Sequence, residues 1–379
     1  MGYGSVLDSQ PRIPLLDLKA QHAPLRGSLA AAFERVMDHG NMVLGAEVAG
    51  FESALSQWLG DVEVVGVSSG TDALLVALMA LGIGPGDEVV TTPFTFVATA
   101  SAALRLGATV RFADVQEGNL MPSVDAFVAA VSPRTRAVIA VDLFGEVSDL
   151  EALQARLGGV PLVEDAAQSL GARRAGKPAG GFGRLATLSF FPAKTLGGFG
   201  DGGAVVTRDA QLAELARRLR VHGARAKYEH AVLGGNFRLD ALQAALLSVK
   251  LPWLEAWRQE RQRLATRYDE AFAELGSLRG LHRDAAVESA HGSYTLRVLD
   301  GSRDVLRRHL DRLGIDTAVH YPRPLHLQPC FEGLGYGPGA FPVAELMSAQ
   351  VLSLPLYPGL AAAQQARVIH GVRQHFGAE

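Results

Sequence analysis

Segments that favour strands and segments that favour helices alternate between residues 63 and 165. Strand-like segments occupy residues 63–67, 88–92, 109–113 and 137–142. Each is followed by an amphipathic segment, at residues 73–81, 97–106, 123–131 and 150–157. Connections of this length form crossovers rather than hairpins, so we expect mostly parallel strands with helices on both faces of the sheet. Sites in such sheets lie beyond the carboxyl ends of the strands. Polar residues that follow strands are therefore the first functional candidates.

The chain has 379 residues, which is more than one hydrophobic core usually supports. A long helical pattern that opens near Phe237 is broken at Pro252. We therefore predict a large α/β domain over residues 1–250 and a smaller C-terminal α+β domain over residues 251–379. The elements expected in the smaller domain are a strand at 294–298 and helices at 302–313, 343–352 and 361–376.

Net charge and cysteine content indicate which partners and which cellular compartment to expect. The formal net charge is only -3 and no long block of like charge occurs, so we expect no nucleic-acid partner. Cys330 is the single cysteine, which excludes an intrachain disulfide and fits a reducing compartment. The start of the chain lacks the pattern of a signal peptide, no apolar run is long enough to span a bilayer, and no histidine pair has the spacing of a zinc site. These features predict a cytoplasmic protein without a membrane partner or a metal.

A phosphate site is the first candidate. Ser69, Gly70 and Thr71 lie between the strand at 63–67 and the helix at 73–81. Unpaired backbone N–H groups and the positive end of the helix dipole favour an anion at such a turn. The alternative is an ordinary helix cap, in which Ser69 or Thr71 binds its own backbone.

The segment that starts at Pro161 is predicted to be a buried strand that ends in two carboxylates, Glu164 and Asp165, with a glutamine close behind. An ionised Asp165 at this position needs a cation or several donors, and a protonated pyridine nitrogen is a suitable partner. The alternative is that Glu164 and Asp165 begin a helix, where carboxylates are favoured by the dipole alone. Gln168 lies three residues further on.

A single lysine, Lys194, stands between an apolar run and a glycine-rich stretch. Burial lowers the pKa of a lysine to a range where the free amine is a nucleophile. Glycines have no side chains to hold the backbone away from a ligand, so a flat cofactor could lie against the loop formed by Gly197, Gly198, Gly200, Gly202 and Gly203. The alternative is a surface lysine in a flexible turn.

A phosphate cradle, an aspartate after a strand and a glycine-flanked lysine, in this order on a parallel framework, fit pyridoxal 5'-phosphate. The cradle holds the phosphate, the aspartate keeps the ring nitrogen protonated and the lysine binds the aldehyde covalently. Four motifs also resemble the DegT/StrS family of nucleotide-sugar aminotransferases, over nearly the whole chain: Ser69-Gly-Thr-Asp-Ala-Leu, Glu164-Asp-Ala-Ala-Gln168, Ser189-Phe-Phe-Pro-Ala-Lys194 and Asn236-Phe-Arg-Leu-Asp. The resemblance implies the aspartate-aminotransferase fold, which is PLP fold type I.

The resemblance implies a role for each matching residue. Lys194 is expected to bind the cofactor covalently and Asp165 to contact the pyridine nitrogen. The other expected cofactor contacts are Gly70, Thr71 and Ser189 at the phosphate, Phe96 stacked on the ring, Gln168 at the ring hydroxyl, and Asn236 at the phosphate of the neighbouring subunit. The last contact implies a homodimer with composite active sites.

The reaction that the resemblance implies is transfer of an amino group from an amino acid, usually glutamate, to a keto group of a nucleotide-linked sugar. Lys194 then serves as covalent anchor and as general acid and base, which requires a lowered amine pKa. The alternatives are a lyase of the same fold and a non-catalytic regulator that binds the cofactor without turnover. A related dehydratase branch carries histidine in place of the lysine, and Lys194 argues against it.

The position that is aminated depends on the substrate side of the site. Family members that aminate C4 typically carry histidine at the position of Phe191 and glutamate at that of Asp201, and this chain has neither. Members that aminate C3 resemble it more closely, including its proline-rich segment 320–327. The expected substrate is therefore a dTDP-3-keto-6-deoxyhexose near Phe191, His320 and His326, with a C4 aminotransferase as the alternative.

Three positions depart from the family pattern. Thr195 follows the lysine where asparagine is common, Asp142 stands where histidine is common, and Arg184 replaces a frequent aspartate. None of these changes removes a group that the cofactor chemistry requires, so they bear on substrate contacts alone.

Overall fold

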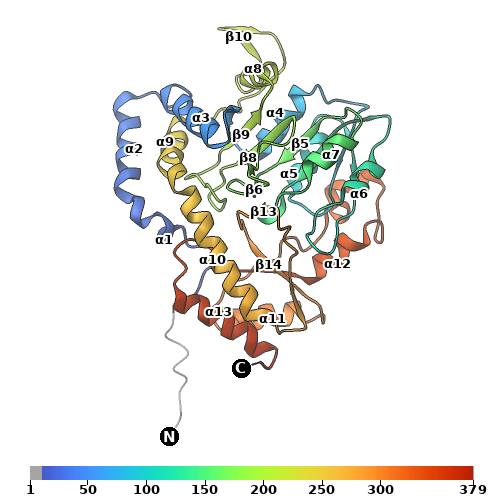
Figure 1. The fold of residues 1–379 in the computed structure, drawn as a ribbon. Coiled ribbons are helices and arrows are strands. Elements are labelled where there is room, and N and C mark those ends of the chain that lie inside the picture. Colours follow the sequence, from blue (N-terminus) through green and yellow to red (C-terminus); the bar gives the residue numbers. More distant parts are fainter. Residues whose placement is uncertain (1–10, 379) are drawn as a thin grey trace.

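The computed structural model describes residues 11–378, and a seven-stranded sheet forms its centre (Figure 1). The strand order is β1-β9-β8-β5-β4-β2-β3. The bounds are β1 (Glu63–Val67), β2 (Glu88–Thr91), β3 (Thr109–Phe112), β4 (Thr135–Val141), β5 (Leu162–Asp165), β8 (Leu185–Ser189) and β9 (Gly203–Thr207). Every strand of this sheet except β9 runs in one direction. The predicted mostly parallel sheet is therefore confirmed.

Helices cover both faces of the sheet. They are α3 (Ala46–Trp58), α4 (Gly70–Ala80), α5 (Val97–Arg105), α6 (Val124–Ala130), α7 (Leu150–Arg156), α8 (Ala210–Leu219) and α9 (Ala241–Lys250). A further helix, α2 (Arg26–His39), packs on α9. Apolar residues of α4, α5 and α8 pack on one face of the sheet. Those of α3 and α9, and of α6 and α7, form two clusters on the other face. The molecule thus has the helix-sheet-helix layering that its alternating pattern predicts.

A second, antiparallel sheet forms the smaller part of the molecule. It contains β12 (Leu278–Gly280), β14 (Tyr294–Val298) and β15 (Val351–Leu354), and its neighbours are α10 (Leu254–Phe272), α11 (Arg303–Arg312), α12 (Pro342–Gln350) and α13 (Ala362–His375). The helix predicted over 343–352 therefore ends at Gln350, and the next residues form a buried strand instead. Ile13 packs in the apolar cluster of this part and pairs with Ile315. The division of the chain at residue 250 stays a prediction.

Shorter elements complete the described chain. They are α1 (Leu18–His22), β6 (Arg173–Arg174), β7 (Lys177–Pro178), β10 (Ala224–Ala226), β11 (Glu229–His230), β13 (Val287–Glu288) and the 3₁₀ turns Ala23–Leu25, Leu143–Gly145, Leu251–Trp253, Leu325–Leu327 and Pro329–Leu334. The hairpin of β10 and β11 extends away from the sheet beyond α8 (Figure 1). Between residues 11 and 378, no helix combines the length and the apolar character that crossing a membrane requires.

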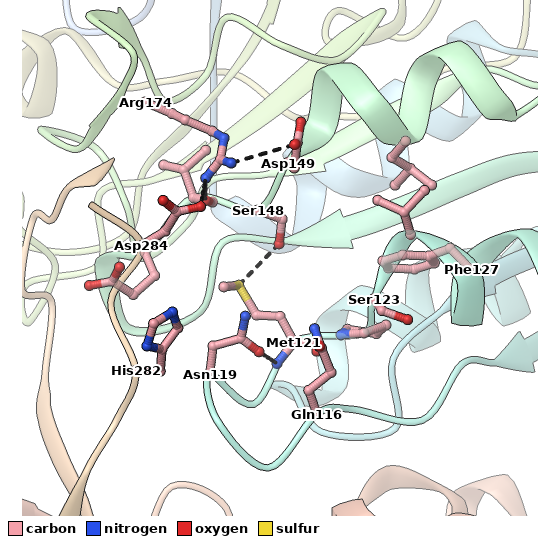
Figure 2. A pocket seen from close by; sticks show the side chains of 15 residues that line it. Gln116, Asn119, Met121, Ser123, Phe127, Ser148, Asp149, Arg174, His282 and Asp284 are labelled. Carbon is pink, nitrogen blue, oxygen red and sulfur yellow. Dashed lines mark hydrogen bonds and ion pairs between the residues drawn. The ribbon is translucent and has the colours of Figure 1, made fainter. Parts of the chain in front are cut away.

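Polar contacts join the two parts of the molecule. Arg174 pairs with Asp284 at 2.9 Å and with Asp149 at 3.5 Å, on the wall of a small cavity of about 190 Å³ (Figure 2). Arg297 in β14 pairs with Glu117 at 2.9 Å. Within this cavity, Arg174 is thus neutralised by two carboxylates of the lining.

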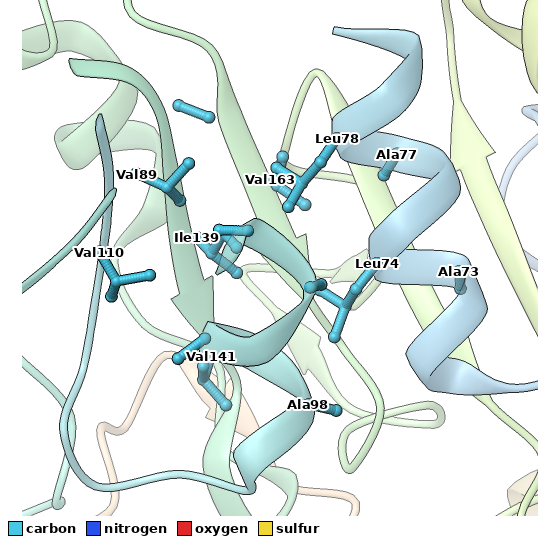
Figure 3. Packing of buried hydrophobic residues seen from close by; sticks show 14 of the residues in the cluster. Ala73, Leu74, Ala77, Leu78, Val89, Ala98, Val110, Ile139, Val141 and Val163 are labelled. Atoms are coloured by element: carbon cyan, nitrogen blue, oxygen red, sulfur yellow. The ribbon is translucent and has the colours of Figure 1, made fainter. Parts of the chain in front are cut away.

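The main core lies between α4 and the sheet. Leu74 and Leu78 of α4 point toward Ile139 and Val163 of the parallel strands (Figure 3). Alanines at positions 73 and 77 allow the helix backbone to lie close to its neighbours. Close packing fixes the start of α4 relative to the ends of the strands, and those ends carry the predicted site residues.

Candidate functional site

One cavity of about 650 Å³ lies where β1, β5 and β8 end. Most of the predicted site residues line it: Gly70, Thr71, Phe96, Asp165, Gln168, Ser189, Phe191, Lys194 and His320. Stretches that are far apart in the sequence thus meet at the carboxyl edge of the sheet. This is the location that the parallel topology predicts.

The start of α4 and the end of β8 form the anion end of the cavity. Ser69 is the N-cap of α4, and its Oγ accepts a hydrogen bond from the N–H of Asp72 at 3.0 Å, so the capping alternative holds for this residue. A Cβ on Gly70 would lie 2.7 Å from the Cβ of Ser189, so only glycine fits here. Gly70, Thr71 and Ser189 are therefore next to one another at a positive helix end, where a phosphate group fits.

Asp165 lies at the bottom of the cavity, where it is 4% exposed. Its Oδ2 accepts a hydrogen bond from Thr99 Oγ1 at 2.8 Å, and its Oδ1 accepts one from the N–H of Ala167 at 3.3 Å. Burial raises the pKa of Asp165, while these two donors and the charge of Lys194 oppose the rise. A cation against this carboxylate would stabilise its ionised form, and a protonated pyridine nitrogen is such a cation.

Glu164 points to the other side of the strand and has a structural role. Its side chain accepts backbone hydrogen bonds from Gly180 at 2.6 Å and from Phe182 at 2.8 Å. The described chain has no helix between β5 and β6, so the alternative that Glu164 and Asp165 begin a helix is wrong.

Lys194 belongs to the loop between β8 and β9, and its own N–H closes a turn with the carbonyl of Phe191 at 2.8 Å. Burial lowers the pKa of the Lys194 amine, and the negative charge of Asp165 opposes this effect. The side chain lines the cavity, so the alternative of a lysine in a flexible surface turn is wrong. A partly desolvated amine opposite a carboxylate can form a covalent bond to a carbonyl carbon.

The glycines that follow Lys194 serve packing within the protein. A Cβ on Gly197 would lie 2.2 Å from the carbonyl oxygen of Pro192, and one on Gly203 would lie 2.4 Å from that of Ser69. None of the five glycines lines the cavity. They let the loop fold tightly against its neighbours, which fixes Lys194.

Gln168 is held in place from both ends of its amide. Its Oε1 accepts a hydrogen bond from the N–H of Phe144 at 3.1 Å, and its Nε2 donates one to the hydroxyl of Tyr321 at 3.0 Å. Phe144 has a left-handed backbone with φ 58°, which is unusual for an aromatic residue. Phe144 and Tyr321 both line the cavity, and sequence reasoning assigned a role to neither. Tyr321 directly follows His320 in the proline-rich segment, so its position next to a predicted site residue could have identified it.

Aromatic residues form the outer wall of the cavity. Phe96 is 54% exposed and Phe191 is 51% exposed, so both rings are open to a ligand. His320 also lines the cavity, its Nδ1 lies 3.2 Å from Ser353 Oγ, and burial lowers its pKa. Its imidazole is therefore neutral near pH 7 and can donate or accept a hydrogen bond.

Two predicted residues lie outside this cavity. His326 is buried, its Nε2 lies 3.0 Å from Glu345 Oε1, and its ring packs edge-on against Phe341. The geometry gives His326 a packing partner and no access to the cavity of this chain. Asn236 is exposed and pairs through its backbone with Val221. No group of histidine, cysteine, aspartate and glutamate side chains in residues 11–378 is arranged to hold a metal ion.

Comparisons with known proteins agree with this geometry. The sequence model of the DegT/DnrJ/EryC1/StrS aminotransferase family matches residues 25–373. The chain is 44% identical to dTDP-3-amino-3,4,6-trideoxy-alpha-D-glucose transaminase of Streptomyces venezuelae, over 96% of each chain. It is 41% identical to a pleiotropic regulatory protein of Geobacillus stearothermophilus, over 96% of this chain and 98% of the relative.

A solved structure resembles the whole molecule. The crystal structure of DesV from S. venezuelae, in complex with a ketimine intermediate, superposes with a TM-score of 0.95. The two sequences are 42% identical, and the match covers 98% of this chain and all of that one. The predicted aspartate-aminotransferase-like fold is confirmed, as is pyridoxal phosphate as the cofactor. The chain therefore belongs to the DegT/DnrJ/EryC1/StrS aminotransferase family and is a pyridoxal-phosphate-dependent aminotransferase.

Proposed function

We propose that this enzyme transfers an amino group from an amino acid, glutamate, to the C3 keto group of a dTDP-linked 3-keto-6-deoxyhexose. The observation that carries the proposal is the juxtaposition of Lys194 and Asp165 in one cavity, where each acts on the pKa of the other. The sugar and its C3 position are supported by the relative from S. venezuelae, a transaminase named for a 3-amino sugar.

Different residues of the cavity would bind different groups of the cofactor. Bound pyridoxal phosphate supplies an aldehyde that accepts an amino group and a ring that withdraws electrons. Asp165 would hold the positive charge of the ring nitrogen, and Gln168 would contact the ring hydroxyl. Phe96 would pack on the ring, while Gly70, Thr71 and Ser189 would bind the phosphate at the start of α4.

Lys194 both anchors the cofactor and moves protons. Burial lowers its amine pKa, and Nζ, once free of the cofactor, would take the proton from the α-carbon of the donor amino acid. In the second half of the reaction the same Nζ returns a proton to the carbon of the sugar that receives the amine. The glycines after Lys194 let the loop pack tightly, which restricts the backbone that carries Nζ.

The outer wall of the cavity faces the sugar. Phe191 offers an apolar ring to the deoxy side of a 6-deoxyhexose. His320, neutral and partly buried, offers one hydrogen bond to a sugar hydroxyl or to the diphosphate. A role for His326 at the diphosphate stays part of the prediction, and it requires the side chain to leave its contact with Glu345.

The proposed active unit is a cytoplasmic homodimer with composite sites. Asn236 is exposed and lies outside the cavity of its own chain, which suits a residue that serves the neighbouring subunit. Leu233, three residues before Asn236, is 92% exposed, so apolar surface is available for a second copy. One relative is named as a regulator, but Lys194 and Asp165 are both in place here, which favours catalysis.

Parallel assays with two sugar isomers test the proposal. Protein loaded with pyridoxamine phosphate receives either the 3-keto or the 4-keto dTDP-6-deoxyhexose, and recovery of the visible absorption of the bound cofactor is followed. We expect faster recovery with the 3-keto sugar. Faster recovery with the 4-keto sugar would overturn the C3 assignment, and no recovery with either isomer would overturn the sugar substrate.

A further inference from the structure

Lys250, at the end of α9, is a buried lysine that the reaction above does not use. It is 1% exposed, and its Nζ donates to the carbonyl of Gly197 and to His22 Nε2, the latter at 2.8 Å. The same Nζ lies 5.3 Å from the ring centroid of Phe199. An ammonium group has three N–H donors, and these contacts present a carbonyl, a ring nitrogen and an aromatic face to them.

Among the residues that the structure describes, no carboxylate forms an ion pair with this lysine. Burial, and after it the charge of Arg261, lowers the pKa of Lys250 to about 8, and within residues 11–378 no acidic group acts on it. Burial without an acidic partner is costly for a lysine. Its contacts therefore point to a use other than an ion pair.

These contacts converge on the loop that carries Lys194. Gly197 and Phe199 lie between β8 and β9, where Lys194 precedes them and Asp201 follows them. Lys194 and Asp201 both line the cavity. Lys250 therefore contacts the middle of a loop, at Gly197, and residues on both sides of that contact line the cavity.

The same face of α9 makes a second contact with this loop. Gln243, seven residues before Lys250, accepts a hydrogen bond through Oε1 from the N–H of Phe199 at 2.8 Å. Side chains seven residues apart lie on one face of a helix. His22, which contacts Lys250 Nζ, also stacks its ring on Phe199 with a centroid distance of 4.8 Å.

We propose that Lys250 is a positioning residue for this aminotransferase: through Gly197, and together with Gln243 and His22, it fixes the loop that holds Lys194. The proposal rests on Lys194 acting in proton transfer. Loosening this loop should change the placement of the Lys194 amine and leave donor binding intact. Proton transfer is sensitive to such placement, whereas binding of the donor depends on other walls of the cavity.

The test compares Lys250→Met with Lys227→Met, which removes an exposed lysine. The full-length enzyme is loaded with pyridoxal phosphate, and the half-reaction with glutamate is followed at several donor concentrations and pH values. For Lys250→Met we expect the maximal rate to fall on the order of tenfold, with the donor concentration at half-maximal rate changed less than about twofold. The pH midpoint of the visible absorption band should also move, because the surroundings of the Lys194 amine change. Lys227→Met should match the unmodified protein in all three.

A wild-type maximal rate and pH midpoint in Lys250→Met would overturn the proposal. If this variant does not fold, Gln243→Met and His22→Phe reach the same loop without emptying the lysine site, and both should lower the maximal rate. Wild-type rates in these two variants would overturn it equally. Failure of the unmodified enzyme to react with glutamate would instead contradict the proposed donor, so the two failures are distinguishable.

Discussion

Gln168 donates a hydrogen bond through Nε2 to the hydroxyl of Tyr321 at 3.0 Å, across 153 positions of the chain. Gln168 follows the strand that carries Asp165, and Tyr321 follows His320 in the proline-rich segment. One hydrogen bond thus joins the cofactor end of the cavity to its substrate end.

Replacing Tyr321 by phenylalanine should weaken cofactor binding. The Nε2 of Gln168 loses its acceptor, which costs about 1 kcal/mol and corresponds to roughly a fivefold rise in the dissociation constant of pyridoxal phosphate. Titration of apoenzyme with the cofactor, followed by visible absorption, measures this constant. Tyr336→Phe is the matched control because Tyr336 packs against Phe112 and does not line the cavity. An unchanged dissociation constant in Tyr321→Phe would show that this hydrogen bond does not contribute to cofactor binding.

Borohydride reduction should fix the cofactor on Lys194. Mass spectrometry of a digest should place the label on the peptide that contains Lys194, and Lys194→Ala should lose both the label and turnover. Lys250 is the informative competitor, because it is also buried and its pKa is also lowered, to about 8. A label on Lys250 would contradict the assignment of the anchor.

Thr99→Val should shift the acidic limb of the rate profile. The Thr99 hydroxyl donates to the ionised form of Asp165, so removing it raises the pKa of this carboxyl further. Activity that needs ionised Asp165 should then fall at a higher pH, by roughly 0.5 to 1 unit. Thr95→Val is the control, because the Thr95 hydroxyl contacts Thr99 at 3.2 Å and the shift should be smaller. Identical acidic limbs in Thr99→Val and the unmodified enzyme would rule out this role of Thr99.

Two inactive variants should restore activity when their subunits mix. Lys194→Ala retains Asn236 and Asn236→Ala retains Lys194, so a mixed dimer contains one complete composite site. We expect each variant alone to be impaired and the refolded mixture to recover up to about a quarter of wild-type activity, since half of the subunits are in mixed dimers and each of these has one complete site. Wild-type activity of Asn236→Ala alone would remove this residue from the site. A mixture no more active than its parents would contradict the sharing of sites.

Lys250 should also give the stability of the protein a distinctive pH dependence. Its pKa is lowered from 10.5 to about 8 in the folded state, so between these values the unfolded chain binds more protons. The free energy of unfolding contributed by this group therefore rises with pH, by up to about 1.4 kcal/mol per pH unit. Denaturant unfolding at pH 8, 9 and 10 measures this effect. The free energy of unfolding of the wild type minus that of Lys250→Met should increase with pH. The same comparison with Lys227→Met controls for the loss of one positive charge, and a constant difference for Lys250→Met would refute the linkage.

The sequence allowed prediction of the residues whose position follows from local pattern. Asp165 and Gly70 follow strands of a parallel sheet, and the ends of such strands meet at one edge. Their presence in one cavity could therefore be predicted without knowing the order of the strands. The order itself depends on which faces pack together, and the position of the antiparallel β9 beside β1 had no local signal.

Other residues depend on contacts that no local pattern encodes. His326 and His320 share one proline-rich segment, yet one is buried beside Glu345 and the other lines the cavity. Their different positions result from the 3₁₀ turn at Leu325–Leu327, which turns His326 toward α12. In the same way, the buried segment 351–354 could not be distinguished from a helix, because a short apolar run fits either structure.

The helix α10 belongs to both cores of the molecule. Leu254 at its start packs with the large sheet, while Leu264 and Phe272 pack with the small one. Because a helix interior without proline resists sharp bending, α10 is a rigid connection between the two cores. A displacement of the small sheet relative to the large one would therefore also displace the start of α10. The start of α10 follows the turn Leu251–Trp253, which follows Lys250, and Lys250 contacts Gly197 in the loop of Lys194, so that loop is connected through α10 to the small sheet.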